Sequence, residues 1–281
     1  MVTGAAGMLG SDVVSVLRGA GHDVVEHTSA TLDLGDSSAV EASAQGCDVI
    51  WNCAAWTAVD EAETHEEEAH VANALIPGNL AAAAASVGAR LVQISTDYVF
   101  AGDATEPYSE DAPTDPRSAY GRTKEAGERA VRAALPDGHL VVRTAWLYGA
   151  NGACFPRTIA RVARERGGVA VVDDQIGQPT WTRDVADLVL RLVDADALTG
   201  TYHATSSGET SWFGFAQQVV AAAGLDPAIV TPTDTGSFPR PAPRPAYSVL
   251  GHAALHGIGV TPIGTWDERW GQASAEVLGI A

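Results

Sequence analysis

The sequence predicts an α/β protein with a doubly wound parallel sheet and a smaller α+β lobe behind it. Three observations predict this class. Strand-like and helix-like segments alternate through the first 150 residues, the pattern of βαβ units. A glycine-rich turn lies between the first strand and the first helix. After Gly149 the alternation gives way to a looser mixture of short elements, which is typical of a lobe that covers a ligand.

The elements follow in order along the chain. In the first half, strands are expected at residues 1–3, 22–27, 48–53, 90–94 and 140–143, and helices from the glycine turn to 20, from about 65 to 87, and from 118 to 135. In the second half, helices are expected at 155–166, 182–194, 211–223 and 266–277, and strands at 169–172 and 202–204. The segment Pro239–Pro245 has four prolines and is expected to form an extended arm.

Composition narrows the classes of function. The chain has 281 residues, 46% of them hydrophobic, which fits a large globular core. A net charge of −18 argues against nucleic acid as a partner. The three cysteines have no metal spacing, and neither a signal peptide nor a membrane span is evident, so we expect a soluble, cytoplasmic protein with reduced thiols.

The glycine-rich turn indicates nucleotide binding. Gly4 permits a tight turn, Gly7 lets backbone N–H groups approach a pyrophosphate, and Gly10 allows the helix to pack closely on the strand. A turn of this kind after the first strand and before a helix predicts a Rossmann-type sheet.

The choice between NAD and NADP is weakly determined. Residues 26–29 read Glu-His-Thr-Ser, with no acid at the position that favours NAD and no arginine for a 2′-phosphate. We expect NADPH or NADH, with a slight preference for NADPH. Asp33 precedes a helix expected at Asp36, so its carboxylate lies near the adenine or serves the turn.

Lys124 is the only lysine in the chain, and it follows Tyr120 by four residues. The other basic side chains are all arginines, so this site needs what a compact ammonium supplies and a guanidinium does not. In a helix the two residues share a face, about 5–6 Å apart at Cβ. A cation there favours the phenolate, so we expect Lys124 to lower the pKa of Tyr120 and make it a proton donor and acceptor.

Hydroxyl groups end the fourth expected strand. Ser95 or Thr96 could polarise a substrate carbonyl there, because ligand groups gather at the carboxyl ends of parallel strands. After the third strand, Ala54 and Ala55 are small enough for a cofactor to lie on the backbone. The carboxylates of Val59–Glu63 are interpreted as helix N-terminal charges, and no metal site is predicted.

Together these residues resemble the extended short-chain dehydrogenase/reductases, which use a Ser or Thr, a Tyr and a Lys in this order for hydride transfer with NAD(P). The resemblance extends over nearly the whole chain to the dTDP-4-dehydrorhamnose reductase family and its sugar-ketoreductase relatives. It is carried by TGAAGMLG, LDLGD, NCAAWTAVDEAE, STDYVFAG, YGRTKEAGE, RTAWLYGANGACF, DDQIGQPTWTRDVA, GTYHATSSGETSWFGFA and RPAPRPAYSVL.

The resemblance implies a role for each site residue. The cofactor-binding residues are Gly4, Gly7, Met8, Leu9, Gly10, Asp33, Leu34, Ala55, Trp56, Thr57, Tyr120 and Lys124. Tyr120, Lys124 and Thr96 are the catalytic residues, and Thr96, Asp97 and Trp146 contact the sugar of a dTDP-sugar substrate. Residues 1–150 then form an NAD(P)-binding domain and 151–281 mainly a substrate lobe, with some segments returning to the first core.

The resemblance also concerns parts of the chain outside the residues named above. Residues 175–180 and the proline arm resemble parts that close over the dTDP moiety, with Arg240 and Arg244 either as diphosphate partners or on a solvated arm. Trp56 is larger than the His or Tyr usual in the family, and only two residues precede Thr3, so the first strand is expected to be short. Some relatives form metal-bridged dimers; a homodimer is compatible with this chain.

The implied activity is reduction of the C4 ketone of a dTDP-4-keto-6-deoxy sugar, foremost dTDP-4-dehydro-L-rhamnose. Three alternatives stay open. The first is a 4-ketoreductase for another deoxysugar. The second is a 4,6-dehydratase, but those enzymes carry an acid pair after the threonine, where this chain has Asp97-Tyr98. The third is a non-catalytic regulatory subunit, like the beta subunit of methionine adenosyltransferase, which need not keep the full triad.

Overall fold

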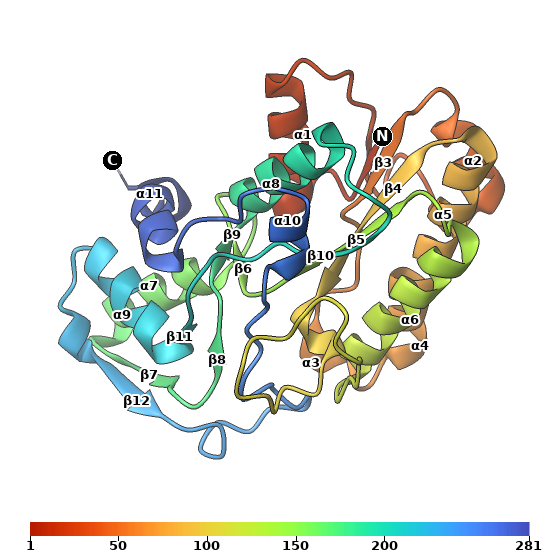
Figure 1. The fold of residues 1–281 in the computed structure, drawn as a ribbon. Coiled ribbons are helices and arrows are strands. Elements are labelled where there is room, and N and C mark those ends of the chain that lie inside the picture. The colour runs from red at the N-terminus through yellow and green to blue at the C-terminus, as the bar shows by residue number, and fades with distance from the viewer. Residues whose placement is uncertain (281) are drawn as a thin grey trace.

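A six-stranded, all-parallel sheet forms the centre of the molecule in the computed structural model, which describes residues 1–280. Its strand order is β2-β1-β3-β4-β5-β10 (Figure 1). The bounds are Val2–Thr3 for β1, Glu26–His27 for β2, Val49–Asn52 for β3, Arg90–Thr96 for β4, His139–Thr144 for β5 and Gly200–His203 for β10. The doubly wound α/β class predicted from the sequence is confirmed.

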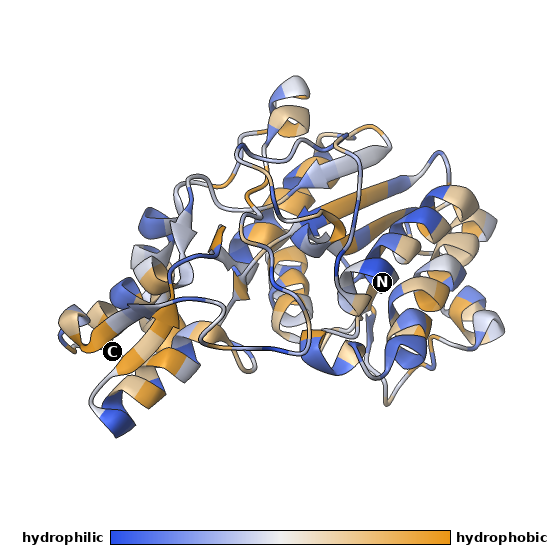
Figure 2. Ribbon diagram, turned by 90° about the horizontal axis from the view of Figure 1, so that it is seen from below, coloured by the Kyte–Doolittle hydropathy of each residue, from blue (hydrophilic) through white to orange (hydrophobic). Residues whose placement is uncertain are grey.

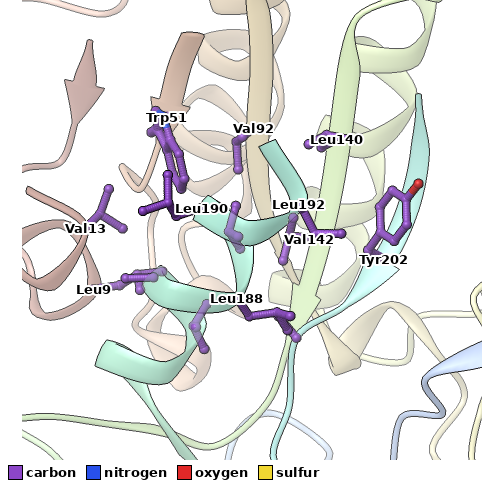
Figure 3. Close-up of a cluster of buried hydrophobic side chains, with 14 of the residues drawn as sticks. Leu9, Val13, Trp51, Val92, Leu140, Val142, Leu188, Leu190, Leu192 and Tyr202 are labelled. Carbon is purple, nitrogen blue, oxygen red and sulfur yellow. The ribbon is translucent and has the colours of Figure 1, made fainter. Parts of the chain in front are cut away.

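Helices cover both faces of this sheet. On one face α1 (Met8–Gly19) packs beside α8 (Thr182–Asp194); on the other lie α2 (Ser37–Ala44), α5 (Ile76–Val87) and α6 (Ala119–Ala134) (Figure 1). Adjacent residues of a strand point to opposite faces of the sheet and pack into different hydrophobic cores. Trp51 and Val92 face α1 and α8 (Figure 3), whereas Ile50 and Leu91 face α2 and α5. Burial on both faces explains why these strands are continuous apolar runs.

The predicted second strand is much shorter than expected. Only Glu26 and His27 pair with β1, and Val25 is half exposed. In β1, Val2 and Thr3 are the two residues that pair with β2 on one side and with β3 on the other.

The helix predicted over 65–87 is interrupted. Its parts are α4 (Glu66–His70), a π-helical turn η1 (Val71–Leu75) and α5. Pro77 has no N–H for the carbonyl of Asn73, and the wider turn, with Ile76 N donating to Val71 O, accommodates it. Gly127 of α6 lies against that Asn73 carbonyl, where a Cβ would collide. The interrupted helix therefore also forms a close contact with α6 at Gly127.

The second lobe has its own apolar core between helices α7, α9 and α11. Figure 2 shows hydrophobic residues gathered along its helices and along the strands of the central sheet. Its elements are α7 (Phe155–Arg166), α9 (Trp212–Ala222), α11 (Trp266–Leu278), β6 (Leu147–Tyr148), β7 (Val169–Val172), β8 (Ile176–Gly177), β9 (Thr180–Trp181), β11 (Thr210–Ser211) and β12 (Val230–Thr233). The short elements α3 (Val59–Ala62), α10 (Ala253–Gly257), η2 (Asp97–Val99) and η3 (Pro227–Ile229) complete the fold.

The predicted bounds of α7, α8 and β7 match the structure. Those of α9 differ from it by one residue at each end, and those of α11 by one residue at the carboxyl end. The arm at 239–245 has no helix or strand, as predicted. Among residues 1–280, no helix combines the length and the hydrophobicity needed to cross a bilayer.

Candidate active site

Two neighbouring cavities lie at the carboxyl end of the sheet. The chain runs from β1 outward to β2 and then returns to β3 on the other side of β1, and this switch point is where open α/β sheets bind ligands. One cavity, of about 700 Å³, is bordered by Gly4, His27 and Asp33. The other, of about 560 Å³, is bordered by Thr96, Tyr120 and Lys124. Gly7, Ala54 and Ala55 border both.

The glycine turn has the close contacts that its sequence predicted. Gly4 has a φ of +66°, and a Cβ there would lie 2.6 Å from the backbone nitrogen of Ala54. A Cβ on Gly10 would collide with the carbonyl of Gly4. Gly7 is the residue before the first turn of α1, so the free N–H groups of that helix face the cavity. These positions fit a dinucleotide pyrophosphate, because they leave the backbone bare where it would bind.

Asp33 borders the larger cavity and also stabilises a turn. Asp33 and Leu34 border the larger cavity, and Asp33 Oδ1 also accepts the Gly35 N–H at 2.9 Å, which fixes the turn before α2. Beside them, both ring nitrogens of His27 are buried without a protein partner. Buried polar atoms of this kind call for a ligand or water, and His27 is one of the residues that border the larger cavity.

The three predicted catalytic residues meet at the second cavity. Ser118 caps α6 through its Oγ and Gly121 N at 3.1 Å, which starts the helix at the end of β4. Lys124 is 3% exposed, and its Nζ donates to the Ile94 carbonyl at 2.7 Å. Thr96, at the end of β4, and Tyr120, on α6, border the same cavity as Lys124. One strand end and one helix face thus bring the triad together.

The prediction that Tyr120 has a lowered pKa is wrong for the ligand-free chain. Burial raises the pKa of Tyr120 to about 12, and hydrogen bonding by Thr96 offsets only part of this. Burial likewise lowers the pKa of Lys124 to about 8, opposed by the negative charge of Glu128. Desolvation is the largest cause of both shifts, because both side chains are enclosed where α6 packs on the end of β4.

Asp97 is buried at the sugar side of this cavity. Its Oδ1 accepts the Thr96 hydroxyl at 2.9 Å, and its Oδ2 is buried without a partner in the described chain. Burial raises the pKa of Asp97 to about 6, although the nearby hydroxyls of Ser248 and Thr96 act in the opposite direction. An unpartnered acceptor that borders a cavity is suited to a substrate hydroxyl.

The burial of Asp97 predicts a pH-dependent cost to stability. Its folded-state pKa lies above the unfolded value, so the folded state holds the proton more tightly and loses stability as pH rises from about 4 to 6. The expected cost at neutral pH is about 3 kcal/mol. Asp97→Asn should therefore be more stable than the parent at pH 7.5 and gain little at pH 4. Urea unfolding at the two pH values measures this; equal gains at both would contradict it.

The backbone of Trp56 is held by a residue that the sequence analysis missed. Asn73, in the π-helical turn, accepts from Trp56 N at 2.9 Å and donates to Trp56 O at 3.1 Å. It also donates to Thr123 of α6 at 3.1 Å. Asn73 thereby ties the loop beside the cofactor site to the catalytic helix. The available signal was an asparagine four residues before a proline in an apolar helix.

The side chain of Trp56 does not border either cavity. Its indole stacks on His65 with ring centres 6.1 Å apart and donates to the Ala58 carbonyl at 3.1 Å. Only neighbouring Ala55 and Thr57 border the cavity near the triad. The large aromatic at this position therefore packs outside the predicted sugar site.

Trp146 lies at the sugar side in an unusual conformation. Its φ is +46°, and its ring stacks on Trp212 with centres 3.6 Å apart. Gly177 makes room for it, since a Cβ there would lie 2.5 Å from the indole. Trp212 of α9 was not predicted from the sequence, yet it borders the triad cavity and also a third cavity in the second lobe.

That third cavity, of about 570 Å³, is bordered by Phe155, Phe238, Arg240 and Arg244. The two arginines are also engaged with Asp60 at the start of α3: Arg244 Nη2 lies 2.8 Å and Arg240 Nη1 3.8 Å from its carboxylate. Ala242 N donates to the same carboxylate at 3.3 Å. The proline arm is therefore attached to the first half of the chain beside the site.

Known proteins resemble this chain in sequence over nearly its whole length. The family model described as the RmlD substrate binding domain matches residues 1–278. A dTDP-4-dehydrorhamnose reductase of Streptomyces griseus is 47% identical over 95% of this chain and 90% of its own. A dTDP-4-keto-6-deoxy-D-glucose reductase of Streptomyces niveus is 46% identical over 97% and 95%.

A solved structure has the same fold as this chain over nearly its whole length. The dTDP-4-dehydrorhamnose reductase of Bacillus anthracis, in complex with NADP, superposes with a TM-score of 0.94 at 38% identity, over 98% of each chain. A family model that spans nearly the whole chain, with relatives of this identity and coverage, shows that the chain belongs to the family of the RmlD substrate binding domain.

Proposed function

We propose that this chain is an NAD(P)H-dependent reductase of the C4 ketone of a dTDP-4-keto-6-deoxy sugar, foremost dTDP-4-dehydro-L-rhamnose, giving dTDP-L-rhamnose. The observation that carries the proposal is the meeting of Thr96, Tyr120 and Lys124 at one cavity next to a glycine turn that fits a dinucleotide. The names and NADP complex of relatives at 38–47% identity support the substrate class and the cofactor.

The cofactor is held by the residues at the two cavities. Gly4, Gly7, Met8, Leu9 and Gly10 lie at the pyrophosphate, since they form the bare backbone turn. Asp33 and Leu34 lie at the adenine, and Ala55 and Thr57 along the cofactor's length. When bound, NAD(P)H supplies the hydride.

Tyr120 delivers the proton. Its raised pKa keeps the phenol protonated at neutral pH, which a donor in the reductive direction requires. The proton passes from the phenol to the C4 oxygen as negative charge develops there. Lys124, whose Nζ lies in the same cavity, then stabilises the phenolate and holds the ribose.

Thr96 and Asp97 orient the sugar. The Thr96 hydroxyl donates to Asp97 and borders the cavity, where its oxygen and proton are placed to contact the C4 oxygen of the sugar. Asp97 Oδ2, which has no partner among the described residues, accepts a sugar hydroxyl, and Trp146 packs on the ring. The cavity bordered by Phe155, Phe238, Arg240 and Arg244 receives the nucleoside diphosphate, with the arginines exchanging Asp60 for phosphate.

The closest alternative is reduction of a different dTDP-4-keto sugar. It is favoured by the Streptomyces niveus relative, which is as similar to this chain as the rhamnose-pathway relative is. A dehydratase is disfavoured because Tyr98, which packs edge-on against Tyr120 at 5.6 Å, occupies the position of the second acid. A purely regulatory subunit would have no reason to keep the triad assembled.

A panel of dTDP-4-keto-6-deoxy sugars with NADPH or NADH tests the proposal. Oxidation of the cofactor is followed at 340 nm, and product NMR assigns the configuration at C4. We expect turnover of dTDP-4-dehydro-L-rhamnose to exceed that of the other sugars. Binding of NADPH without turnover of any of them would contradict a reductase and favour the regulatory alternative.

A further inference from the structure

Glu128 is a fully buried carboxylate one helical turn after Lys124, and the proposed mechanism gives it no role. Its side chain is 0% exposed, and it lies on the same face of α6 as Tyr120 and Lys124. Burial of an ionised carboxylate is costly unless it is fully paired. The groups that pair with Glu128 therefore indicate its role.

Four hydrogen bonds surround this carboxylate. Arg143 of β5, itself 3% exposed, donates Nε to Oε1 at 2.9 Å and Nη2 to Oε2 at 2.8 Å. Ser95 of β4 donates its Oγ to Oε1 at 2.6 Å, and Arg132 of α6 donates to Oε2 at 2.9 Å. Although burial raises the pKa of Glu128, the bonds from Arg143 outweigh it and hold that pKa below its usual value. The group is ionised.

Lys124 forms no salt bridge among residues 1–280, and the charge of Glu128 acts on it from the next turn of α6. Its Nζ donates to the Ile94 carbonyl, which is neutral and also accepts Gln93 Nε2 at 2.9 Å. Cys53 faces it from the end of β3, but burial raises the pKa of that thiol to about 12, so it is uncharged. Tyr120 on the same helix is protonated at neutral pH. Glu128 is the one charge that favours the ammonium form.

We infer that Glu128 is a positioning residue for this reductase site: its carboxylate, kept ionised by Arg143 and Arg132, keeps Lys124 protonated in a dry environment and fixes α6 against β4 and β5. This inference deepens the proposed function. The protonation of Lys124, however, can be measured without any substrate.

The sign of the effect distinguishes this role from a structural one. Glu128→Gln keeps the shape and removes the negative charge, while Arg143 and Arg132 stay, so the Lys124 ammonium loses its attraction and gains repulsion. Its pKa should fall. Arg143→Gln removes a positive charge and leaves Glu128, so the pKa of Lys124 should rise. A loosened, wetter site would instead move the pKa upward in both variants, toward the free lysine value.

The solitary lysine makes the measurement direct. Protein grown with ¹³Cε-lysine and free of lysine-containing tags gives one lysine resonance, that of Lys124. Its pH titration by ¹³C NMR reads the pKa, in the free protein and with NADPH. We expect a fall of at least one pH unit in Glu128→Gln, a tenfold loss of proton affinity. The alkaline limb of the pH profile of kcat/KM should shift downward by the same amount.

The matched control is Glu125→Gln. Glu125 lies next to Lys124 on α6 and is also mostly buried, but it pairs with exposed Arg129. Its substitution should leave the Lys124 titration unchanged. If the pKa of Lys124 is unchanged or raised in folded Glu128→Gln, the inference is overturned. A fall in the pKa of Lys124 in Arg143→Gln would also overturn it. The second variant keeps the inference testable if the first does not fold. A shifted pKa with no reductase activity in the parent protein would instead contradict the proposed function.

Discussion

Tyr120→Phe is expected to lower kcat for ketone reduction about 10²- to 10⁴-fold, the usual contribution of a positioned general acid. The change removes one oxygen and leaves the ring, which packs edge-on against Tyr98 and borders the triad cavity. The other two members of the triad are already engaged, because Thr96 donates to Asp97 and Lys124 donates to the Ile94 carbonyl. Stopped-flow oxidation of NADPH with saturating substrate measures the loss.

Binding and folding should survive this change. Removal of a buried hydroxyl whose pKa is raised by desolvation leaves no partner charge behind. The dissociation constant for NADPH should therefore change less than about threefold, or about 0.7 kcal/mol. Tyr202→Phe serves as the control, since its hydroxyl bonds only the Leu198 carbonyl at 2.9 Å, at the opposite end of the sheet. Near-parental turnover in Tyr120→Phe would remove the tyrosine from the mechanism.

The parts of the fold that depend on local sequence could be predicted. The helices α7 and α8 and the strand β7 begin and end where their sequence patterns do. The glycine turn was also predictable, because the spacing of Gly4 and Gly10 follows from backbone contacts that tolerate no Cβ. The triad was predictable for a similar reason: one strand end and one helix face carry all three groups.

Features that depend on distant partners could not be predicted. The π-helical turn at Val71–Leu75 reflects Pro77, but Asn73 acquires its role only because Trp56 and Thr123 come to lie beside it. The positive φ of Trp146 has no local signal, and the ring fits only because Gly177 and Trp212 are brought against it from later in the chain.

The pKa shifts and ion pairs of the site were the features least predictable from the sequence. Helical spacing placed Lys124 beside Tyr120 correctly, but the sign of the tyrosine pKa shift depends on burial, which spacing does not reveal. Arg240 and Arg244 were expected to be available for a diphosphate or solvated, and both are engaged by Asp60 in the ligand-free chain. Linear sequence contains no sign of that pairing, which joins residues some 180 positions apart.

Lys124→Arg is expected to lower kcat/KM at least about 100-fold, although the positive charge is kept. The ammonium lies 2.7 Å from the Ile94 carbonyl in a space closed by β4 and α6, with 3% of the residue exposed. A planar guanidinium is broader and must displace either that carbonyl contact or the cofactor ribose. This explains why a chain with 16 arginines retains one lysine here.

Arg122→Lys provides the reciprocal control on the same helix. Arg122 forms a two-point bond with Glu66 at 2.8 Å on the exposed side of α6, away from the cavity. Loss of the second bond should cost at most about 1 kcal/mol of stability and leave kcat/KM within twofold, because exposed ion pairs contribute little. Thermal unfolding and NADPH titration of both variants separate a local effect from misfolding. If Lys124→Arg folds, binds NADPH and turns over normally, a positive charge suffices at this position and the requirement for lysine is refuted.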